Sequence, residues 1–293
     1  MLGEILALSS AICIGFSNVF VKNVTPRFGT LYLTALRLVV SLVMAIAAGF
    51  IFSDMSSLFQ VELKFLVVLL VAGIIMMIGH IALVKAISLD DVSRVAPATT
   101  GLYILSCVLV SILATDNKVS WWTALGGLLV LLGVYLISKN DGSKFTFRNV
   151  FSLRLKFYAL IFASVTGLFW AIGAVFTDIV VDQVAPIPAA AFRLLFMTMV
   201  IMGVLAYKQG FVIKGISKKD IFVIFVSGVF LGGATLTFIG ALAVTSPSIV
   251  VVLNSTYPFF VAPLAVIWLK EKITRQVIMG MIACFLGVLT TLI

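Results

Sequence analysis

Two stretches of the sequence decide the fold: Leu31-Tyr-Leu-Thr-Ala-Leu-Arg37-Leu and, 156 residues later, Ile187-Pro-Ala-Ala-Ala-Phe-Arg193-Leu. The same spacing lays residues 7–20 over residues 163–176, with Phe20 opposite Phe176. Similarity at a fixed spacing is the mark of an internal repeat. The chain is therefore interpreted as a duplicated unit.

Composition identifies the solvent that surrounds the two copies. Of 293 residues, 62% are hydrophobic and 11% are charged, whereas soluble domains carry roughly half apolar and a quarter charged residues. One water-facing globule could not bury this much apolar surface, so the excess indicates lipid. The three cysteines lie inside apolar runs, which argues against disulfides and against a thiolate metal site.

The spacing of apolar blocks predicts an all-α membrane protein with ten transmembrane helices. A spanning helix needs about 20 mostly apolar residues. Blocks of this kind lie at 2–22, 30–52, 64–87, 92–114, 120–138, 157–177, 187–207, 221–243, 247–269 and 275–293. We expect a first five-helix repeat over 1–138, a basic linker over 139–155 and a second repeat over 156–293. Because five is odd, the second repeat should be inverted relative to the first.

Charge predicts the orientation in the membrane. Fourteen Lys and Arg residues lie in the loops and helix ends that follow odd-numbered spans, against two, Lys64 and Lys118, on the other side. The positive-inside rule then places both termini outside the cytoplasm. The same rule accounts for the net charge of +9, so nucleic-acid binding is not needed to explain it. Glu4 precedes an apolar run with no basic n-region or cleavage site, so a retained span is expected there.

Several matched residues also resemble a known family. The run from Ala241-Leu-Ala-Val through Leu253-Asn-Ser-Thr-Tyr-Pro258 to Leu269-Lys-Glu271-Lys-Ile-Thr274, with Gly280 and Gly287, resembles the second repeat of EamA-type transporters in the drug/metabolite transporter superfamily. The first repeat matches less well. Asn117 stands where the pattern has Glu, and Gly101 stands where it has Pro.

The resemblance implies a ten-helix carrier similar to the aromatic amino acid and metabolite exporters. Members of this group export amino acids and other metabolites or take up small solutes, so the resemblance does not specify the substrate. They are usually described with both termini in the cytoplasm. That description conflicts with the charge count, and both orientations stay open at this point.

Two aromatic side chains in the middle of spans are candidates for binding solute. His80, the sole histidine, could donate to a substrate carboxylate or carry a proton; equally, it could be bonded to a backbone carbonyl. Trp170 lies near the small residues Gly167 and Gly173, where its indole could stack on a ligand or hold a cation. It could also be a packing residue.

A polar cluster in the ninth span is a further candidate. Asn254, Ser255, Thr256 and Tyr257 cannot all face lipid cheaply, and Pro258 removes a backbone hydrogen bond. We expect Asn254, Ser255 and Tyr257 to line a central cavity. The same argument, in weaker form, applies to three further substrate-binding candidates: Tyr103, Ser106 and Asn18.

Arg37 and Arg193 stand at equivalent places about two turns into the second and seventh spans. Either could pair with an anionic substrate. Because the arginine recurs at matched positions, a shared structural role is favoured, such as reaching the interface or bonding backbone carbonyls.

Missing motifs limit the mechanism. No Asp or Glu lies in the middle of a span, so exchange of a proton for a cation through an embedded acid loses support. The sequence also has no Walker loop, no metal-ligand cluster and no nucleophile paired with His80 as its base. We therefore expect no enzyme activity, no cofactor and no metal site.

The expected function is secondary transport of a small organic solute by alternating access. An amino acid or related metabolite is preferred, with export or exchange favoured over uptake. The first alternative is a cationic amine such as choline, held in an aromatic cage of Trp170 and Tyr257. A more remote one is an intramembrane enzyme or lipid-handling protein. The predicted location is the plasma or inner membrane, as a monomer or weak dimer in contact with the lipid bilayer and a small-molecule substrate, without nucleic acid.

Overall fold

The computed structural model describes residues 1–114, 121–138, 147–181, 183–209 and 216–290. All regular structure in these residues is helical, which confirms the all-α prediction for them. The elements are α1 Leu2–Val24, α2 Thr30–Phe52, η1 Met55–Gln60, α3 Leu63–Leu89, α4 Val92–Ala114, α5 Trp121–Ser138, α6 Phe147–Val181, α7 Pro186–Gln209, α8 Lys218–Leu242, α9 Pro247–Asn254, α10 Tyr257–Leu269 and α11 Arg275–Thr290.

Seven helical stretches in the described residues are long and apolar enough to cross a membrane. They are Leu2–Val24, Thr30–Phe52, Leu63–Leu89, Arg154–Val180, Pro186–Lys208, Lys218–Leu242 and Ile249–Leu269. Two shorter apolar helices cover Leu125–Ile137 and Arg275–Thr290, and α4 covers the expected span 92–114. The ten-span count and the inverted arrangement of the repeats stay predictions.

The structure differs from the sequence prediction in two places. α6 already begins at Phe147, inside the segment 139–155 that was expected to be a linker. The expected span 247–269 is divided into α9 and α10, since Ser255 and Thr256 are not part of either helix. Three predictions lie outside the described residues: the matched segment 116–120 with Asn117 and Lys118, the linker lysines Lys139 and Lys144, and Lys214.

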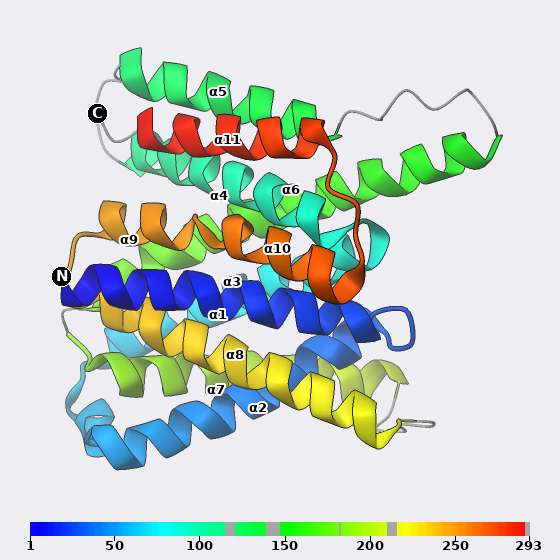
Figure 1. Ribbon diagram of the computed structural model, residues 1–293. Coiled ribbons are helices and arrows are strands. Elements are labelled where there is room, and N and C mark those ends of the chain that lie inside the picture. The colour runs from blue at the N-terminus through cyan, green and yellow to red at the C-terminus, as the bar shows by residue number, and fades with distance from the viewer. Residues whose placement is uncertain (115–120, 139–146, 182, 210–215, 291–293) are drawn as a thin grey trace.

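The helices form one bundle in which α1 packs against α8 and α3 packs against α6 (Figure 1). α5 and α11 form a further pair beside α4. Their contact depends on glycine, because a Cβ on Gly133 would lie 2.6 Å from the Gly280 carbonyl oxygen and one on Gly287 would lie 2.6 Å from the Gly126 oxygen. The two glycine pairs therefore let α5 and α11 pack closely at one side of the bundle.

A second glycine contact joins α2 to α8. A Cβ on Gly228 would lie 2.6 Å from the Val40 Cβ, and one on Gly232 would lie 3.1 Å from the Ser41 backbone. The close approach lets the Ser41 hydroxyl donate to the Gly228 carbonyl oxygen over 2.8 Å. These glycines therefore serve helix packing.

We name the two ends of the bundle by their charge. The basic end is where α1, α3 and α10 finish and α4 and α8 begin; the opposite end is where α1 begins and α11 finishes (Figure 1). At the basic end the Lys22 ammonium donates to the backbone oxygens of Ile87 (2.6 Å) and Asp90 (2.7 Å). This contact satisfies carbonyl groups that the last turn of α3 would otherwise leave free.

Glu271 holds the first turn of α4 from the loop between α10 and α11. Its carboxylate accepts from the Val92 and Ser93 backbone N–H groups and from the Ser93 hydroxyl, at 2.9, 3.0 and 2.7 Å. An acidic side chain is favourable at a helix N-terminus because the free N–H groups there carry partial positive charge. Lys270 turns the chain toward α4 with a positive φ of 56°.

Candidate functional site

A cavity lies near the middle of the bundle, where seven helices meet. Its volume is about 50 Å³, which leaves room for a few water molecules. The lining side chains belong to Ser10, Ile14, Met76, His80, Tyr103, Trp170, Arg193, Leu231, Ala234, Thr235, Phe238 and Asn254. None of these is an acid, so among the described lining residues the formal charge is that of Arg193 alone.

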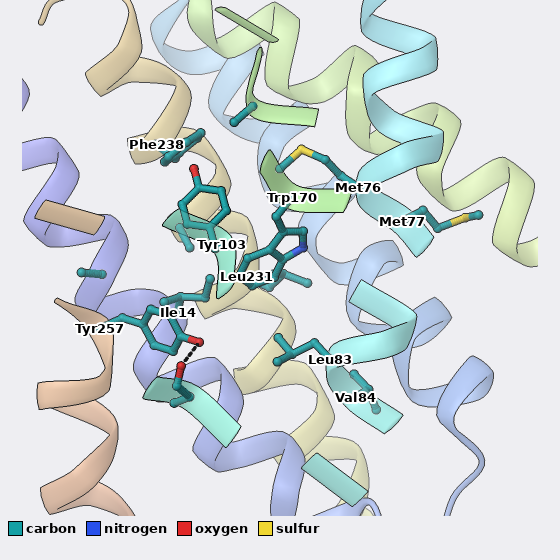
Figure 2. Packing of buried hydrophobic residues seen from close by; sticks show 14 of the residues in the cluster. Ile14, Met76, Met77, Leu83, Val84, Tyr103, Trp170, Leu231, Phe238 and Tyr257 are labelled. Carbon is teal, nitrogen blue, oxygen red and sulfur yellow. Dashed lines mark hydrogen bonds between the residues drawn. The ribbon is translucent and has the colours of Figure 1, made fainter. Parts of the chain in front are cut away.

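Aromatic rings form one wall of the cavity. The His80 and Trp170 ring centroids lie 5.3 Å apart with an angle of 62° between the planes, and Tyr103 meets Trp170 edge-on at 6.5 Å. Figure 2 shows Trp170 between Met76 and Tyr103, with Phe238 over the hydroxyl end of Tyr103. The indole lies on Gly79, where a Cβ would approach it to 2.6 Å. That glycine therefore fixes the position of Trp170.

Three lining residues carry buried polar atoms for which the described residues supply no hydrogen-bond partner. They are Nε1 of Trp170, Nε of Arg193 and Oδ1 of Asn254. Burying such a group without a partner costs free energy. Two donors and one acceptor thus belong to residues that line a single cavity, although Nε1 of Trp170 lies on its Gly79 side. A ligand could supply the missing bonds.

The two matched arginines differ in their surroundings. Both are buried, with 1% of Arg37 and 3% of Arg193 exposed. Arg37 donates through Nη2 to the Ser17 hydroxyl at 2.6 Å, and it does not line the cavity. Arg193 donates through Nη1 to the Thr177 hydroxyl at 3.0 Å and does line it. The geometry therefore separates a packing arginine from one available to a ligand.

The break between α9 and α10 positions Asn254. Ser255 donates back to the Val251 oxygen at 2.5 Å, and Thr256 donates to the Leu253 oxygen at 2.7 Å. These bonds satisfy the end of α9 where the backbone leaves the helical path. Pro258 lies in the first turn of α10, where its missing N–H is not needed.

The remaining candidates lie away from the cavity. The Tyr257 hydroxyl donates to the Ala96 oxygen at 3.0 Å, the bond drawn in Figure 2. Ser255 and Ser106 are buried but do not line the cavity. Asn18 is 1% exposed, with both amide atoms unpartnered among the described residues. It shares a face of α1 with Ser10 and Ile14, one turn nearer the basic end than Ile14.

Sequence reasoning missed part of the lining. Ser10, Met76, Thr235 and Phe238 were not predicted, although Ser10 and Thr235 are hydroxyl residues inside apolar spans. Both lie in spans that also carry other small or polar residues, so the sequence offered no reason to choose them. Among the described residues, no group of three or more His, Cys, Asp or Glu side chains could hold a metal ion.

A family model described as the EamA-like transporter family matches residues 1–139 and 157–293. The chain belongs to this family. As a member of the EamA-like family, the protein is a membrane transporter of some solute. Its several helices that are long and apolar enough to cross a membrane agree with this. The two matched segments leave out residues 140–156, close to the midpoint of the sequence.

Two further similarities cover all or nearly all of the chain. An "Uncharacterized transporter" from Archaeoglobus fulgidus is 26% identical over 298 residues, covering 100% of this chain and 99% of that protein. A crystal structure of another protein superposes with a TM-score of 0.68 at 16% sequence identity, over 98% of this chain and 94% of that one. At that identity the superposition shows a shared fold.

Proposed function

We propose that this EamA-like protein is a secondary carrier for an amino acid or a closely related carboxylate metabolite, which it exports or exchanges. The observation that carries the proposal is the set of three unpartnered polar atoms around the central cavity. A substrate carboxylate could accept from Nε of Arg193 and Nε1 of Trp170, while its ammonium group donates to Oδ1 of Asn254. Hydrogen bonds with a charged partner are the stronger ones.

The apolar lining suits the rest of such a molecule. Ile14, Met76, Leu231 and Phe238 surround the polar atoms, and none of these side chains competes for the substrate's charged groups. The aromatic wall of Tyr103 and Trp170 adds a surface on which an aromatic or large aliphatic side chain could pack. We therefore favour neutral amino acids with bulky side chains.

A cationic amine such as choline has less support. The cage suggested for it needs Tyr257, whose hydroxyl is bonded to Ala96 and which does not line the cavity. Arg193 does line it, and like charges repel in a site with little water. No described lining residue supplies a carboxylate that would offset this repulsion.

Transport by alternating access requires the cavity to change size. At about 50 Å³ it is too small for an amino acid, so substrate entry requires the surrounding helices to move apart. Its lining residues lie from the middle of the bundle toward the opposite end, beyond the Tyr257–Ala96 hydrogen bond. We infer that, starting from this conformation, the carrier opens first at the opposite end, by movement of one half of the bundle against the other.

We also propose that the basic end faces the cytoplasm, which leaves the N-terminus outside. Alkaline phosphatase fused after Ile293 should be active in intact cells, and a fluorescent protein fused there should be dark. The reverse pattern would place the basic end outside and would contradict the charge rule for this chain.

The substrate class is tested by counterflow in liposomes that contain the purified protein. Labelled phenylalanine, leucine and choline are each offered against the same unlabelled compound inside. We expect saturable flux with the amino acids and none with choline. Saturable choline flux, or no flux with any amino acid, would overturn the proposal.

The site is tested with a matched pair of tryptophan variants. Trp170→Phe keeps an aromatic side chain, although a smaller one, and removes the N–H donor; loss of one hydrogen bond should weaken substrate binding by about fivefold. Trp268→Phe is the control, since Trp268 is half exposed and packs on Phe16 and Phe20 away from the cavity. Equal weakening by both changes would mean that Trp170 acts only in packing.

A further inference from the structure

A second cavity lies at the basic end, between α4, α5 and α6. Its volume is about 200 Å³, and its lining residues are Asp90, Arg94, Val95, Ala98, Ile137, Lys156, Phe157, Ala159, Leu160 and Ala163. It is separated from the central cavity by the close contact of α4 and α6, where a Cβ on Gly167 would lie 2.6 Å from the Tyr103 backbone nitrogen. The second cavity is therefore a distinct site.

The polar side of this cavity has an excess of positive charge. Arg94 and Lys156 face a single acid, Asp90. Arg94 approaches the Asp90 carboxylate with Nε at 3.4 Å, while its Nη2 is buried with no hydrogen-bond partner among the described residues. Burial raises the pKa of Asp90, although Arg94 and Lys156 act in the opposite direction. An anion at this point would complete the hydrogen bonding of Arg94.

The rest of the cavity is apolar. Seven of the lining residues are Val, Ala, Ile, Leu or Phe. A small inorganic anion would make no use of this apolar surface. The cavity also lies beside surfaces suited to lipid: Phe157 is 62% exposed, and Leu132 and Tyr135 on α5 are exposed as well. A ligand with a charged head and an apolar chain fits both parts.

We propose that this cavity binds an anionic phospholipid, with its phosphate on Arg94 and Lys156 and an acyl chain along Ala98, Leu160 and Ala163. Basic pockets between transmembrane helices are a recurring place for such headgroups. Because α4 and α6 also supply Tyr103 and Trp170 to the central cavity, a lipid held here would lie against both helices that carry the aromatic wall.

Native mass spectrometry of the detergent-purified protein, titrated with phosphatidylglycerol or phosphatidylcholine, tests the proposal. We expect tighter binding of the anionic lipid. Lys156→Gln should weaken phosphatidylglycerol binding by about fivefold, the effect of one basic residue near a headgroup. Arg154→Gln is the matched control, because Arg154 lies two residues away on α6 and over the Tyr158 ring but does not line the cavity.

A third variant separates the lipid from a free anion. Ala163→Leu fills the apolar part and leaves Arg94 and Lys156 in place, so it should reduce lipid binding while circular dichroism stays unchanged. Three results would overturn the proposal: equal weakening by Lys156→Gln and Arg154→Gln, equal affinity for the two lipids, or full displacement of phosphatidylglycerol by millimolar inorganic phosphate. The last would identify a site for free phosphate.

Discussion

The two ends of the molecule are held by different kinds of contact. At the basic end, charged side chains reach across the fold: Glu271 bonds the start of α4, and Arg27 pairs with Asp220 at 2.5 Å. At the opposite end, two ion pairs of the described residues are local, between Met1 and Glu4 and between Glu62 and Lys64. One contact between distant segments there involves no charge, where Gly3 packs against the Thr245 side chain.

This difference indicates which end opens at lower cost. Separating helices at the basic end would remove Glu271 from the N–H groups of α4 and Arg27 from the nearly buried Asp220. Polar groups that stay buried without their partners cost free energy. Separating α1 from Thr245 at the opposite end breaks van der Waals contacts, which small movements can replace. A carrier that alternates must therefore weaken the charged contacts in its other state.

The largest expected effect comes from Glu271→Ala. This change removes the acceptor for three donors of α4, and we expect the free energy of unfolding to fall by about 3 kcal/mol. Thermal unfolding in detergent should show a lower Tm. Hydrogen exchange should rise in the first turn of α4 before it rises in α3.

The matching change at the opposite end is Glu62→Ala. Glu62 is 67% exposed in its pair with Lys64, and exposed pairs contribute little to stability. An equal loss of Tm in the two variants would remove the distinction between the ends.

A smaller effect is expected for the pair formed by Arg27. Arg27→Gln leaves Asp220, whose side chain is 3% exposed, without its cation, although the Ser217 hydroxyl still donates to it. We expect a loss of about 1 kcal/mol, reduced at high salt because Arg27 itself is 55% exposed. Lys64→Gln is the control and should have no measurable effect. Salt-independent loss would mean that Arg27 acts by packing.

The smallest effect is a gain. Lys270 adopts a positive φ of 56°, which costs a residue with a Cβ roughly 1 kcal/mol and costs glycine little. Lys270→Gly should therefore raise the free energy of unfolding by up to about 1 kcal/mol. The gain should disappear in the Glu271→Ala background if the turn serves to hold Glu271 against α4. A persistent gain would make the turn independent of that contact.

Sequence periodicity predicted the helical class and most helix positions, since each apolar block has the length that lipid requires. The hydrogen bond lost at Pro258 indicated a kink in this span, but not that the helix would break at Ser255 and Thr256, whose hydroxyl groups bond the carbonyls of the preceding turn. Nor could the sequence separate Arg37 from Arg193. The two arginines have similar neighbours in sequence, and each donates to a hydroxyl in the fold, but only Arg193 lines the cavity.

The candidate site was predicted where a residue was unusual for its span. His80, Trp170, Tyr103 and Asn254 were found in this way and lie around one cavity. On α1 the same reasoning predicted Asn18 and did not identify Ser10. Both lie on one face of α1, and the cavity is at the level of Ser10. The height of a cavity along a helix is set by the neighbouring helices, which sequence polarity does not report.

The contact between Glu271 and Val92 has a consequence for how the protein is made. The two residues are 179 positions apart, so α4 enters the membrane long before its carboxylate partner is synthesised. Until the last loop arrives, the first turn of α4 has to bond to water or to lipid headgroups. The completion of this helix therefore waits for the end of translation, and it couples the maturation of the first half of the chain to the arrival of the second.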